Sequence, residues 1–487
     1  MEQIQIRFIN ENKAVTVEKG STLLDAQIKA GLLPDAPCGG KGTCGKCKVL
    51  IGGKEVLACQ TTVERDMAVE CIKRSQSNIL TKGIATQVEP NGKHDFVVAF
   101  DIGTTTVVAY LMNGLTGELL SCCGALNPQT QYGADVISRV QLAMDGGSDT
   151  LASCIRESLA TLVTEVSGKA GIHSEEIALA AIVGNTAMHH LFLGIDPASL
   201  VKPPYMPNVS NALELPAKGL LPIANHGTIR ILPNIAGFVG ADTVGCILST
   251  RFDQLDELTL MIDIGTNGEL VMGNRHQMLA CSTAAGPAFE GARISCGMRG
   301  AEGAIDHVWL EEGHVCWHVI GEGKAIGLCG SGLLDLIAVL LEIGVIDETG
   351  KLLCGSEYRL GNTSVALTQK DIREVQLAKA AIRAGVELMA EHLDKSVDQI
   401  RKVFLAGAFG SFLKPDSICK IGMIPPCLRN KIESIGNAAG EGAKLCALSE
   451  REFKYSIRLA EKTEFLELAS LPQFQDCYVD ALNFEEE

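Results

Sequence analysis

A strand–turn–strand unit occurs twice in this chain and constrains its fold more than any other feature. Residues 96–110 read FVVAFDIGTTTVVAY, and residues 258–272 read LTLMIDIGTNGELVM. Each copy starts with an apolar run of strand length, passes through Asp-Ile-Gly-Thr and continues into a second strand. Asp101 and Asp263 lie 162 positions apart. A duplication at this distance predicts two related lobes, each a mixed β-sheet with flanking helices.

The two turns carry the residue types that bind phosphate. A glycine-rich turn surrounds phosphate oxygens with backbone N–H groups and side-chain hydroxyls. The carboxylates that open the turns, Asp101 and Asp263, are expected to position Mg²⁺, mostly through water, together with the attacking water. One such turn is often purely structural, whereas two turns separated by the length of one predicted lobe predict a nucleotide site. The expected phosphate-binding residues are Gly103, Thr104, Thr105, Gly265, Thr266 and Asn267.

Residues 96–450 resemble the superfamily of acetate and sugar kinases, heat-shock protein 70 and actin. Its five segments match in order Asp101–Thr106 (phosphate 1), Ala178–Leu193 (connect 1), Asp263–Gly268 (phosphate 2), Val403–Gly410 (adenosine) and Gly436–Leu445 (connect 2). The resemblance implies a two-lobed, actin-like (ribonuclease H-like, duplicated) α/β ATPase. It implies that Gly407, Ala408 and Phe409 line the adenosine site. The small residues of connect 2 predict a helix that crosses its counterpart closely.

Four further residues are candidates for the nucleotide site. Gly330 and Ser331 lie in GLCGSG before an expected helix, where backbone N–H groups bind a phosphate or the nucleoside; Ser331 as a helix N-cap is the alternative. Asp135 and Asp242 each follow Gly-Ala in the first lobe. They are candidate bases or water-positioning groups, with helix capping as the alternative. The chain has no GxxxxGK[ST] motif, so the sequence does not support a P-loop NTPase.

Near the N-terminus, Cys38, Cys44, Cys47 and Cys59 follow the spacing C-x5-C-x2-C-x11-C. Thiolates are soft ligands that suit Fe–S clusters or zinc. Zinc sites more often pair two C-x2-C units, and this region has one. The region resembles the [2Fe–2S] ferredoxins, although both outer gaps differ from the plant-type spacing. Cys71 is the alternative fourth ligand, and zinc or free thiols remain the alternative to a cluster.

The expected domains follow from these motifs. A ββα unit and further short strands predict a β-grasp ferredoxin-like domain over residues 1–76, and polar residues 77–95 read as a linker. Residues 96–255 form ATPase lobe 1, and residues 256–487 form lobe 2, whose C-terminal segment partly returns to lobe 1.

Charge and hydropathy exclude several function classes. The formal net charge of −16 gives no electrostatic footprint for nucleic acid or an anionic membrane. We find no run of about 18 apolar residues, so a cytoplasmic protein is expected. The 18 cysteines favour a metal or redox site over a disulfide framework in that compartment.

Taken whole, the chain resembles the reductive activators of corrinoid proteins. The segments that carry this resemblance are Asn127–Gln129 with Gly133–Val136, Gly184–His189, Gly237–Asp242 and Gly286–Gly291. The resemblance implies that ATP drives the reduction of Co(II) to Co(I) in a partner corrinoid protein. It implies a [2Fe–2S] cluster, ATP and Mg²⁺, with a low-potential donor such as ferredoxin, and it admits a homodimer.

Three other functions stay open at this point. One is an ATP-driven donor like the activators of 2-hydroxyacyl-CoA dehydratases, which hold one [4Fe–4S] cluster between two subunits. A second is a nucleotide-binding redox sensor, and a third is a small-molecule kinase with an appended ferredoxin. We interpret His189 and His190 as core or surface histidines rather than cobalt ligands, and Arg293 and Arg299 as salt-bridge partners.

Overall fold

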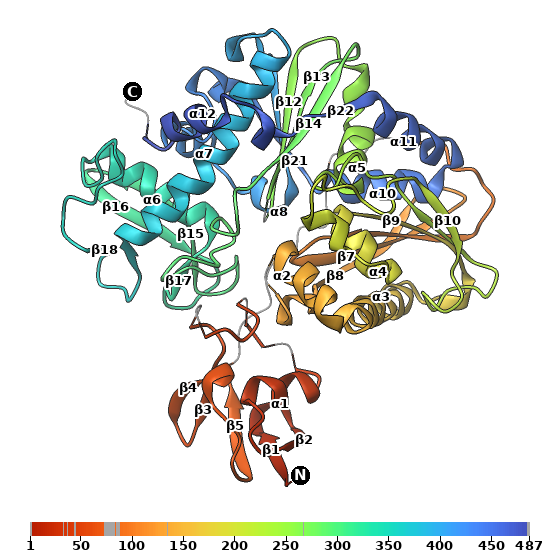
Figure 1. Cartoon of the computed structure of the whole chain (residues 1–487), viewed down its shortest axis with the longest axis horizontal. Helices are drawn as coiled ribbons and strands as arrows, with labels where there is room; N and C mark the ends of the chain where they lie inside the picture. The colour runs from red at the N-terminus through yellow and green to blue at the C-terminus, as the bar shows by residue number, and fades with distance from the viewer. Residues whose placement is uncertain are drawn as a thin grey trace.

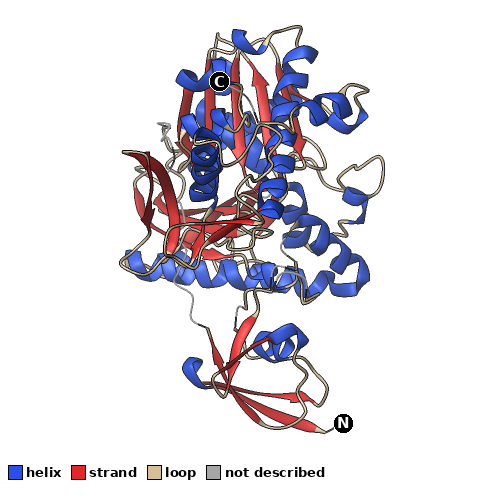
Figure 2. Cartoon of the chain, turned by 90° about the vertical axis from the view of Figure 1, so that its left-hand side faces the viewer, coloured by secondary structure: helices blue, strands red, loops and turns tan. Residues whose placement is uncertain are grey.

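The computed structural model places the chain in a small N-terminal domain and two larger lobes (Figure 1). It describes residues 2–32, 34–36, 38–42, 45–72, 83, 88–133, 135–265 and 267–484. The N-terminal domain lies at one end of the molecule in both views (Figure 1, Figure 2). Among the described helices, none is long and apolar enough to cross a bilayer.

The N-terminal domain is the predicted β-grasp unit. Its sheet has the order β2-β1-β5-β3-β4, in which β1 and β5 pair in parallel. Alternate residues of β1 point into the core, and Thr22 begins the helix by exchanging hydrogen bonds with Asp25. The elements are β1 (Gln3–Phe8), β2 (Lys13–Glu18), α1 (Leu23–Lys29), β3 (Lys48–Ile51), β4 (Lys54–Leu57) and β5 (Met67–Cys71).

Lobe 1 is built on a six-stranded sheet of order β10-β11-β9-β6-β7-β8. Its central strand β6 pairs antiparallel with β7 and parallel with β9. The strands are β6 (Phe96–Ile102), β7 (Thr106–Asn113), β8 (Leu119–Leu126), β9 (Ile177–Gly184), β10 (Leu213–Pro216) and β11 (Thr228–Ile231). The helices are α2 (Val136–Leu142), α3 (Ser148–Ala170), α4 (Thr186–Leu193) and α5 (Ala241–Thr250).

Lobe 2 repeats this plan, as the duplicated motif predicts. Its sheet has the order β21-β20-β12-β13-β14-β22, and β12 pairs antiparallel with β13 and parallel with β20. The strands are β12 (Thr259–Ile264), β13 (Gly268–Gly273), β14 (Met278–Thr283), β20 (Lys402–Ala406), β21 (Ile432–Gly436) and β22 (Thr463–Phe465). The helices are α6 (Gly330–Glu342), α7 (Gln369–His392), α8 (Gly407–Gly410), α9 (Pro415–Lys420) and α12 (Phe474–Asp480).

Two small sheets complete lobe 2. One has the order β16-β15-β17, and the other pairs β18 with β19. Their bounds are β15 (Ala304–Glu311), β16 (His314–Val319), β17 (Gly327–Leu328), β18 (Glu357–Arg359) and β19 (Ala366–Thr368).

The C-terminal segment connects the lobes. Helices α10 (Ala438–Leu448) and α11 (Glu450–Lys462) pack on lobe 1, whereas β22 joins the lobe 2 sheet. A Cβ on Gly442 of α10 would lie 2.3 Å from the carbonyl oxygen of Gly245, so the two backbones touch. The close crossing predicted for connect 2 is therefore confirmed.

The helix that α10 crosses corrects one part of that prediction. Its partner is α5, whereas the sequence assigned connect 1, and hence the crossing helix, to Ala178–Leu193. Helix α4 of that segment packs with α3 on the opposite face of the sheet. The reason is steric, because Gly245 on α5 leaves room for a second backbone.

Candidate functional site

Four half-buried carboxylates lie near one another where the two lobes meet. Asp101 lies in β6 and Asp263 occupies the equivalent position in β12, while Asp242 comes from α5 and Glu269 from β13. Burial raises the pKa of Asp101 and of Asp263 to about 7, and the charge of Asp242 raises both further. The Asn437 amide donates to Asp101 Oδ2 at 2.8 Å and favours its charged form.

The other two carboxylates share this electrostatic setting. Burial raises the pKa of Asp242 to about 6, although its Oδ1 accepts a hydrogen bond from the Thr243 N–H at 2.8 Å. Burial, and then the charges of Asp242 and Asp263, raise the pKa of Glu269 well above its ordinary value. Carboxylates that repel one another attract a divalent cation, and Mg²⁺ prefers such oxygen donors. Among the described residues, no three acidic, cysteine or histidine side chains are placed to hold one ion directly.

Glu269 was missed by the sequence analysis. The signal was available, because a glutamate interrupts the apolar run that forms β13. An acid in a strand of a packed sheet needs a polar partner, and half-buried Glu269 lies opposite Ser282 of β14.

The first phosphate turn is held by a dense set of hydrogen bonds. The Gly103 N–H donates to the Thr106 carbonyl at 2.9 Å, and a Cβ on Gly103 would lie 2.8 Å from that oxygen. The Asn185 amide donates to Thr104 Oγ1 at 2.9 Å. Thr105 Oγ1 donates to Glu290 Oε2 at 2.8 Å. The predicted turn is therefore preorganised, with both threonine hydroxyls engaged by neighbouring side chains.

The second turn is one residue shorter than the first. The Gly265 N–H donates to the Asn267 carbonyl at 2.9 Å, two residues on, whereas the Gly103 N–H bonds a carbonyl three residues on. Thr266 lies outside the described residues. Gly407 follows β20 with φ of +83°, and a Cβ there would lie 2.4 Å from Asp263 Oδ1. Only glycine allows the adenosine segment to approach this carboxylate so closely.

Arg139 is a buried cation behind the first turn, and the sequence analysis missed it. Its side chain is fully buried and donates to the carbonyls of Thr104 at 2.6 Å and Gly133 at 2.9 Å. Burial lowers its pKa to about 10, and the charges of Asp135 and Glu290 oppose this shift. Nothing in the sequence separates this arginine from a solvated one on the helix.

Asp135 is not part of the carboxylate group. It is the N-cap of α2, where its Oδ1 accepts hydrogen bonds from the Ser138 N–H at 2.7 Å and the Ser138 hydroxyl at 2.8 Å. Its charge is not among those that raise the pKa of Asp101, Asp242 or Asp263. Of the two candidate bases predicted in lobe 1, the structure brings Asp242 alone to the site.

The adenosine segment meets an aromatic residue of lobe 2. The rings of Phe409 and Phe289 stack with centroids 5.6 Å apart and planes at 11°. Gly330 fits beside them because a Cβ there would lie 2.3 Å from the Phe409 ring and 2.0 Å from the Phe289 carbonyl oxygen. The described backbone at Ala408 belongs to α8.

Ser331 does not cap its helix. Helix α6 begins at Gly330 with Cys329 as N-cap residue, and Ser331 Oγ donates to the Asp306 carbonyl at 2.8 Å. The capping alternative is therefore wrong. The prediction failed because the helix starts at Gly330, before the apolar run that begins at Leu333.

The cysteine loop brings three of the four predicted ligands together. The Cys59 N–H donates to Cys47 Sγ at 3.5 Å. Burial raises the pKa of Cys59 to about 11, and hydrogen bonding and charge from Cys47, then charge from Cys38, raise it further. Cys44 lies outside the described residues. Cys38, Cys47 and Cys59 thus lie near one another, and thiols are the ligands that suit an iron–sulfur cluster.

The alternative ligand, Cys71, lies elsewhere in the domain. Its sulfur accepts from the Gln27 amide at 3.4 Å, and its N–H donates to Asn10 Oδ1 at 2.9 Å. The loop itself needs glycine, because φ is +60° at Gly39 and +82° at Gly40. The geometry therefore groups Cys59, rather than Cys71, with the other cysteines.

The histidines and Arg293 have structural roles. His189 and His190 are buried in α4, and burial lowers the pKa of both, that of His189 to about 3. His190 Nε2 accepts from the Asn208 N–H at 3.1 Å. Arg293 pairs with Glu374 at 3.7 Å. These contacts confirm the interpretation of the histidines as core residues and of Arg293 as a salt-bridge partner.

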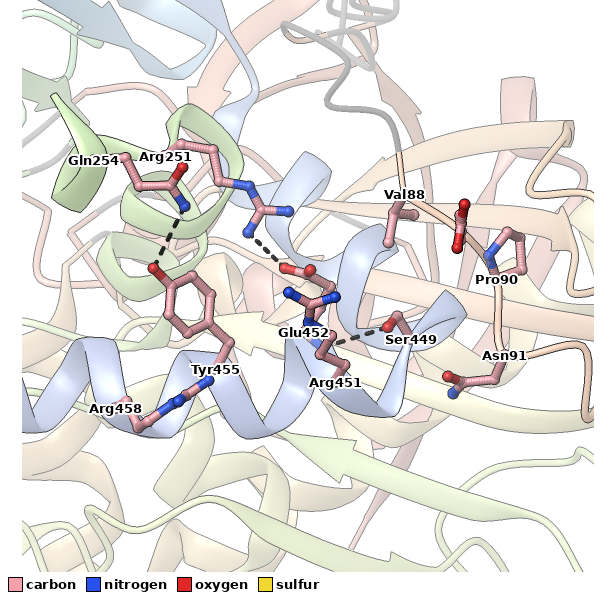
Figure 3. A pocket seen from close by; sticks show the side chains of 11 residues that line it. Val88, Pro90, Asn91, Arg251, Gln254, Ser449, Arg451, Glu452, Tyr455 and Arg458 are labelled. Atoms are coloured by element: carbon pink, nitrogen blue, oxygen red, sulfur yellow. Dashed lines mark hydrogen bonds and ion pairs between the residues drawn. The ribbon is translucent and has the colours of Figure 1, made fainter.

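A separate polar cavity of about 770 Å³ lies between α11 and residues 88–91. Figure 3 shows Arg251 directed at Glu452 across it, with their atoms 2.5 Å apart. Tyr455 and Arg458 line the same cavity from α11. None of the predicted nucleotide-binding residues is among its lining residues, so this cavity is distinct from the carboxylate site.

Three family models match the chain in sequence order. Residues 8–71 match the 2Fe-2S iron-sulfur cluster binding domain, and residues 96–255 match the RACo middle region. Residues 257–487 match the model described as "C-terminal domain of RACo the ASKHA domain".

Two curated relatives and one solved structure are similar over most of the chain. Corrinoid activation enzyme RamQ of Eubacterium limosum is 33% identical over 586 aligned positions, covering 98% of each chain. The [Co(II) methylated amine-specific corrinoid protein] reductase of Methanosarcina barkeri is 25% identical, covering 80% of this chain and 76% of the relative. The structure of a reductive activator for corrinoid,iron-sulfur protein superposes with a TM-score of 0.74 at 29% identity, covering 99% of this chain and 98% of the other.

Proposed function

The chain belongs to the family of corrinoid activation enzymes, and we propose that it uses ATP to drive the reduction of Co(II) to Co(I) in a partner corrinoid protein. The observation that carries the proposal is the presence, in one chain, of a half-buried carboxylate group beside two phosphate turns and a separate loop that gathers thiols. When bound, the [2Fe–2S] cluster supplies one-electron transfer between a low-potential donor and the cobalt. Cys38, Cys44, Cys47 and Cys59 would hold that cluster.

The two turns and their carboxylates are assigned to ATP. We assign Asp101 and Asp263 to Mg²⁺, which they would hold, because both are half-buried acids at equivalent strand positions. When bound, Mg²⁺ supplies positive charge to the phosphates. The residues assigned to phosphate are Gly103, Thr104, Thr105, Gly265, Thr266 and Asn267, and those assigned to the nucleoside are Gly330, Ser331, Gly407, Ala408 and Phe409.

Asp242 is the preferred proton acceptor for the attacking water. A general base is most effective when its pKa lies near the working pH, and burial raises the pKa of Asp242 to about 6. Glu269 and Asp242 interact electrostatically, so it costs free energy for both carboxyl groups to be charged at once. Asp135 is the weaker candidate because Ser138 already occupies its carboxylate.

ATP is needed because the electron transfer is uphill or gated. A tenfold change in a one-electron equilibrium corresponds to about 59 mV, and the free energy of ATP hydrolysis covers several such steps. A ferredoxin or a similar low-potential protein is the proposed donor, and a homodimer is the proposed assembly. The proposed location is the cytoplasm, and none of the described cysteines is placed in a disulfide.

The test is an anaerobic reduction assay on the complete protein. The cluster-loaded protein is mixed with reductant, Mg-ATP and a Co(II) corrinoid protein from the same organism, and the visible spectrum is recorded. We expect a Co(I) band that requires ATP. The matched control replaces ATP with a non-hydrolysable analogue. A spectrum that stays Co(II) with the cognate partner contradicts the proposal.

A further inference from the structure

One tripeptide of lobe 2 touches all three parts of the proposed machinery. Phe289, Glu290 and Gly291 follow one another in a turn between β14 and β15, and each contacts a different partner. The partners are the adenosine segment, the first phosphate turn and the cysteine loop. None of these contacts was expected from the sequence.

Glu290 holds a hydroxyl that the proposed function gives to phosphate. Thr105 Oγ1 donates its single proton to Glu290 Oε2 at 2.8 Å. A threonine hydroxyl has one donor, so it cannot donate to a phosphate oxygen at the same time. A bound phosphate also repels the Glu290 carboxylate, because both are anionic. Donation from the Thr105 hydroxyl to phosphate and the Thr105–Glu290 hydrogen bond are therefore mutually exclusive.

The residue after Glu290 holds the cysteine loop. The Lys46 ammonium donates to the Gly291 carbonyl at 2.5 Å and to the Gly297 carbonyl at 3.1 Å. Lys46 lies directly before Cys47 in the loop that gathers the thiols. The docked position is visible in Figure 1, where the N-terminal domain meets the lobes near β17 and α2.

A second contact fixes the same loop to lobe 1. Gly39 packs against the Tyr132 backbone so closely that a Cβ would lie 3.1 Å from the Tyr132 carbonyl oxygen. The next residue, Gly133, accepts a hydrogen bond from Arg139, which also binds the Thr104 carbonyl. Both contacts of the cysteine loop are thus connected to the first phosphate turn through a short series of covalent and hydrogen bonds.

We propose that Phe289–Gly291 is a nucleotide-sensing link that releases the cysteine loop from the ATPase lobes. Glu290 is its positioning residue and Lys46 its clamp. The inference rests on the proposed function, because it takes ATP as the ligand of the Thr105 turn. When phosphate binds the Thr105 hydroxyl, Glu290 moves away, the Gly291 carbonyl shifts, and the hydrogen bond from Lys46 to that carbonyl is weakened. The thiol loop is then free to face a corrinoid protein.

Among the described residues, the N-terminal domain and the lobes share no apolar core, since the N-terminal domain has its own. The contacts of Lys46 and Gly39 described above are polar or backbone contacts. An ammonium that donates to two carbonyls is a directional contact, and a small shift of either carbonyl weakens it. The link is therefore suited to a reversible change rather than to permanent assembly.

The experiment measures amide hydrogen exchange of residues 38–47 and 286–299 in the cluster-loaded protein, with and without a non-hydrolysable ATP analogue and Mg²⁺. Nucleotide is expected to speed exchange of both segments by about fivefold. Lys46→Met keeps the aliphatic stem and removes the ammonium. It is expected to give that faster exchange without nucleotide. Lys48→Met is the matched control, because Lys48 pairs with Glu55 inside the N-terminal domain, at 2.8 Å.

Glu290 variants test the link itself. Glu290→Ala removes the acceptor of Thr105 and is expected to make exchange of the loop independent of nucleotide. Glu290→Gln keeps an acceptor oxygen and is expected to restore most of the dependence. Calorimetry on each variant checks that the nucleotide analogue still binds.

Two results overturn the inference. One is equal exchange in the Lys46→Met and Lys48→Met proteins, and the other is nucleotide binding that leaves exchange unchanged or slows it. A wild-type protein that binds no nucleotide overturns the proposed function itself. That failure is distinguishable, because the comparison of the two lysine variants needs no nucleotide.

Discussion

The carboxylate group between the lobes and the cysteine loop both gather ligands that repel one another, but they do so on different scaffolds. Asp101 and Asp263 lie in central strands of two large sheets, each flanked by helices on a continuous core. The cysteines lie on a glycine-rich loop over the small core of the N-terminal domain. The large cores of the lobes therefore offset the free-energy cost of the half-buried acids. The N-terminal domain has a smaller core, so its stability depends more on what its loop binds.

The cysteine loop gives the largest expected effect. Cys59→Ala removes a thiol that contacts Cys47, so we expect loss of the [2Fe–2S] spectrum and of all Co(II) reduction. The lobes should keep nucleotide binding, measured by calorimetry, because their cores are separate. Cys71→Ala is the matched control in the same domain and should keep the spectrum. The reverse pattern would show that Cys71 is the fourth ligand.

Asp263→Ala tests the other half of the comparison. We expect ATP-dependent Co(II) reduction to fall by about 10²–10³-fold, because an electrostatic contact of the transition state is lost. The cluster spectrum should stay intact, since Asp263 contacts Cys246 and the adenosine segment rather than the N-terminal domain. The absorbance spectrum and the reduction assay are read on the same sample. Loss of the cluster in this variant would show that the two regions are not independent.

Much of this arrangement could be predicted from the sequence, because the patterns that predict it are local. Apolar runs around Asp101 and Asp263 predicted two equivalent strands, and the cysteine spacing predicted which thiols gather. Arg139, Glu290 and Lys46 were not predicted. Each acquires its role from a partner far along the chain, as when Lys46 binds carbonyls 245 and 251 positions away. No local pattern marks a backbone carbonyl as an acceptor for a distant cation.

Arg139→Met tests how much a buried cation stabilises the lobes. The substitution leaves the buried carbonyls of Thr104 and Gly133 without their donor, and each such loss costs about 1–3 kcal/mol. We expect the lobes to lose about 3 kcal/mol of unfolding free energy in urea denaturation, with the cluster spectrum retained in the native protein. Arg293→Met is the control, because Arg293 is exposed and its pair with Glu374 is long, at 3.7 Å. Equal losses in both variants would rule out a special role for the buried cation.

The smallest expected effect is a dependence of lobe stability on pH and divalent cation. Folding raises the pKa of Asp101 and Asp263 from 3.8 to about 7 and that of Asp242 to about 6, mainly by burial, so the folded lobes bind more protons than the unfolded chain between these values. Glu269 and Cys246 face the same group, and burial raises the pKa of both. Unfolding free energy should therefore fall as pH rises through this range without divalent cation.

Magnesium should cancel that loss. Because the cation replaces protons on the same oxygens, it should raise the melting temperature of the lobes by about 5 °C above pH 7 and by much less below pH 6. Scanning fluorimetry with a chelator or with Mg²⁺ at each pH measures the difference. Asp263→Asn removes one repelling charge and should flatten the dependence. A magnesium effect of equal size at both ends of the range would mean that these carboxylates are not where the cation binds.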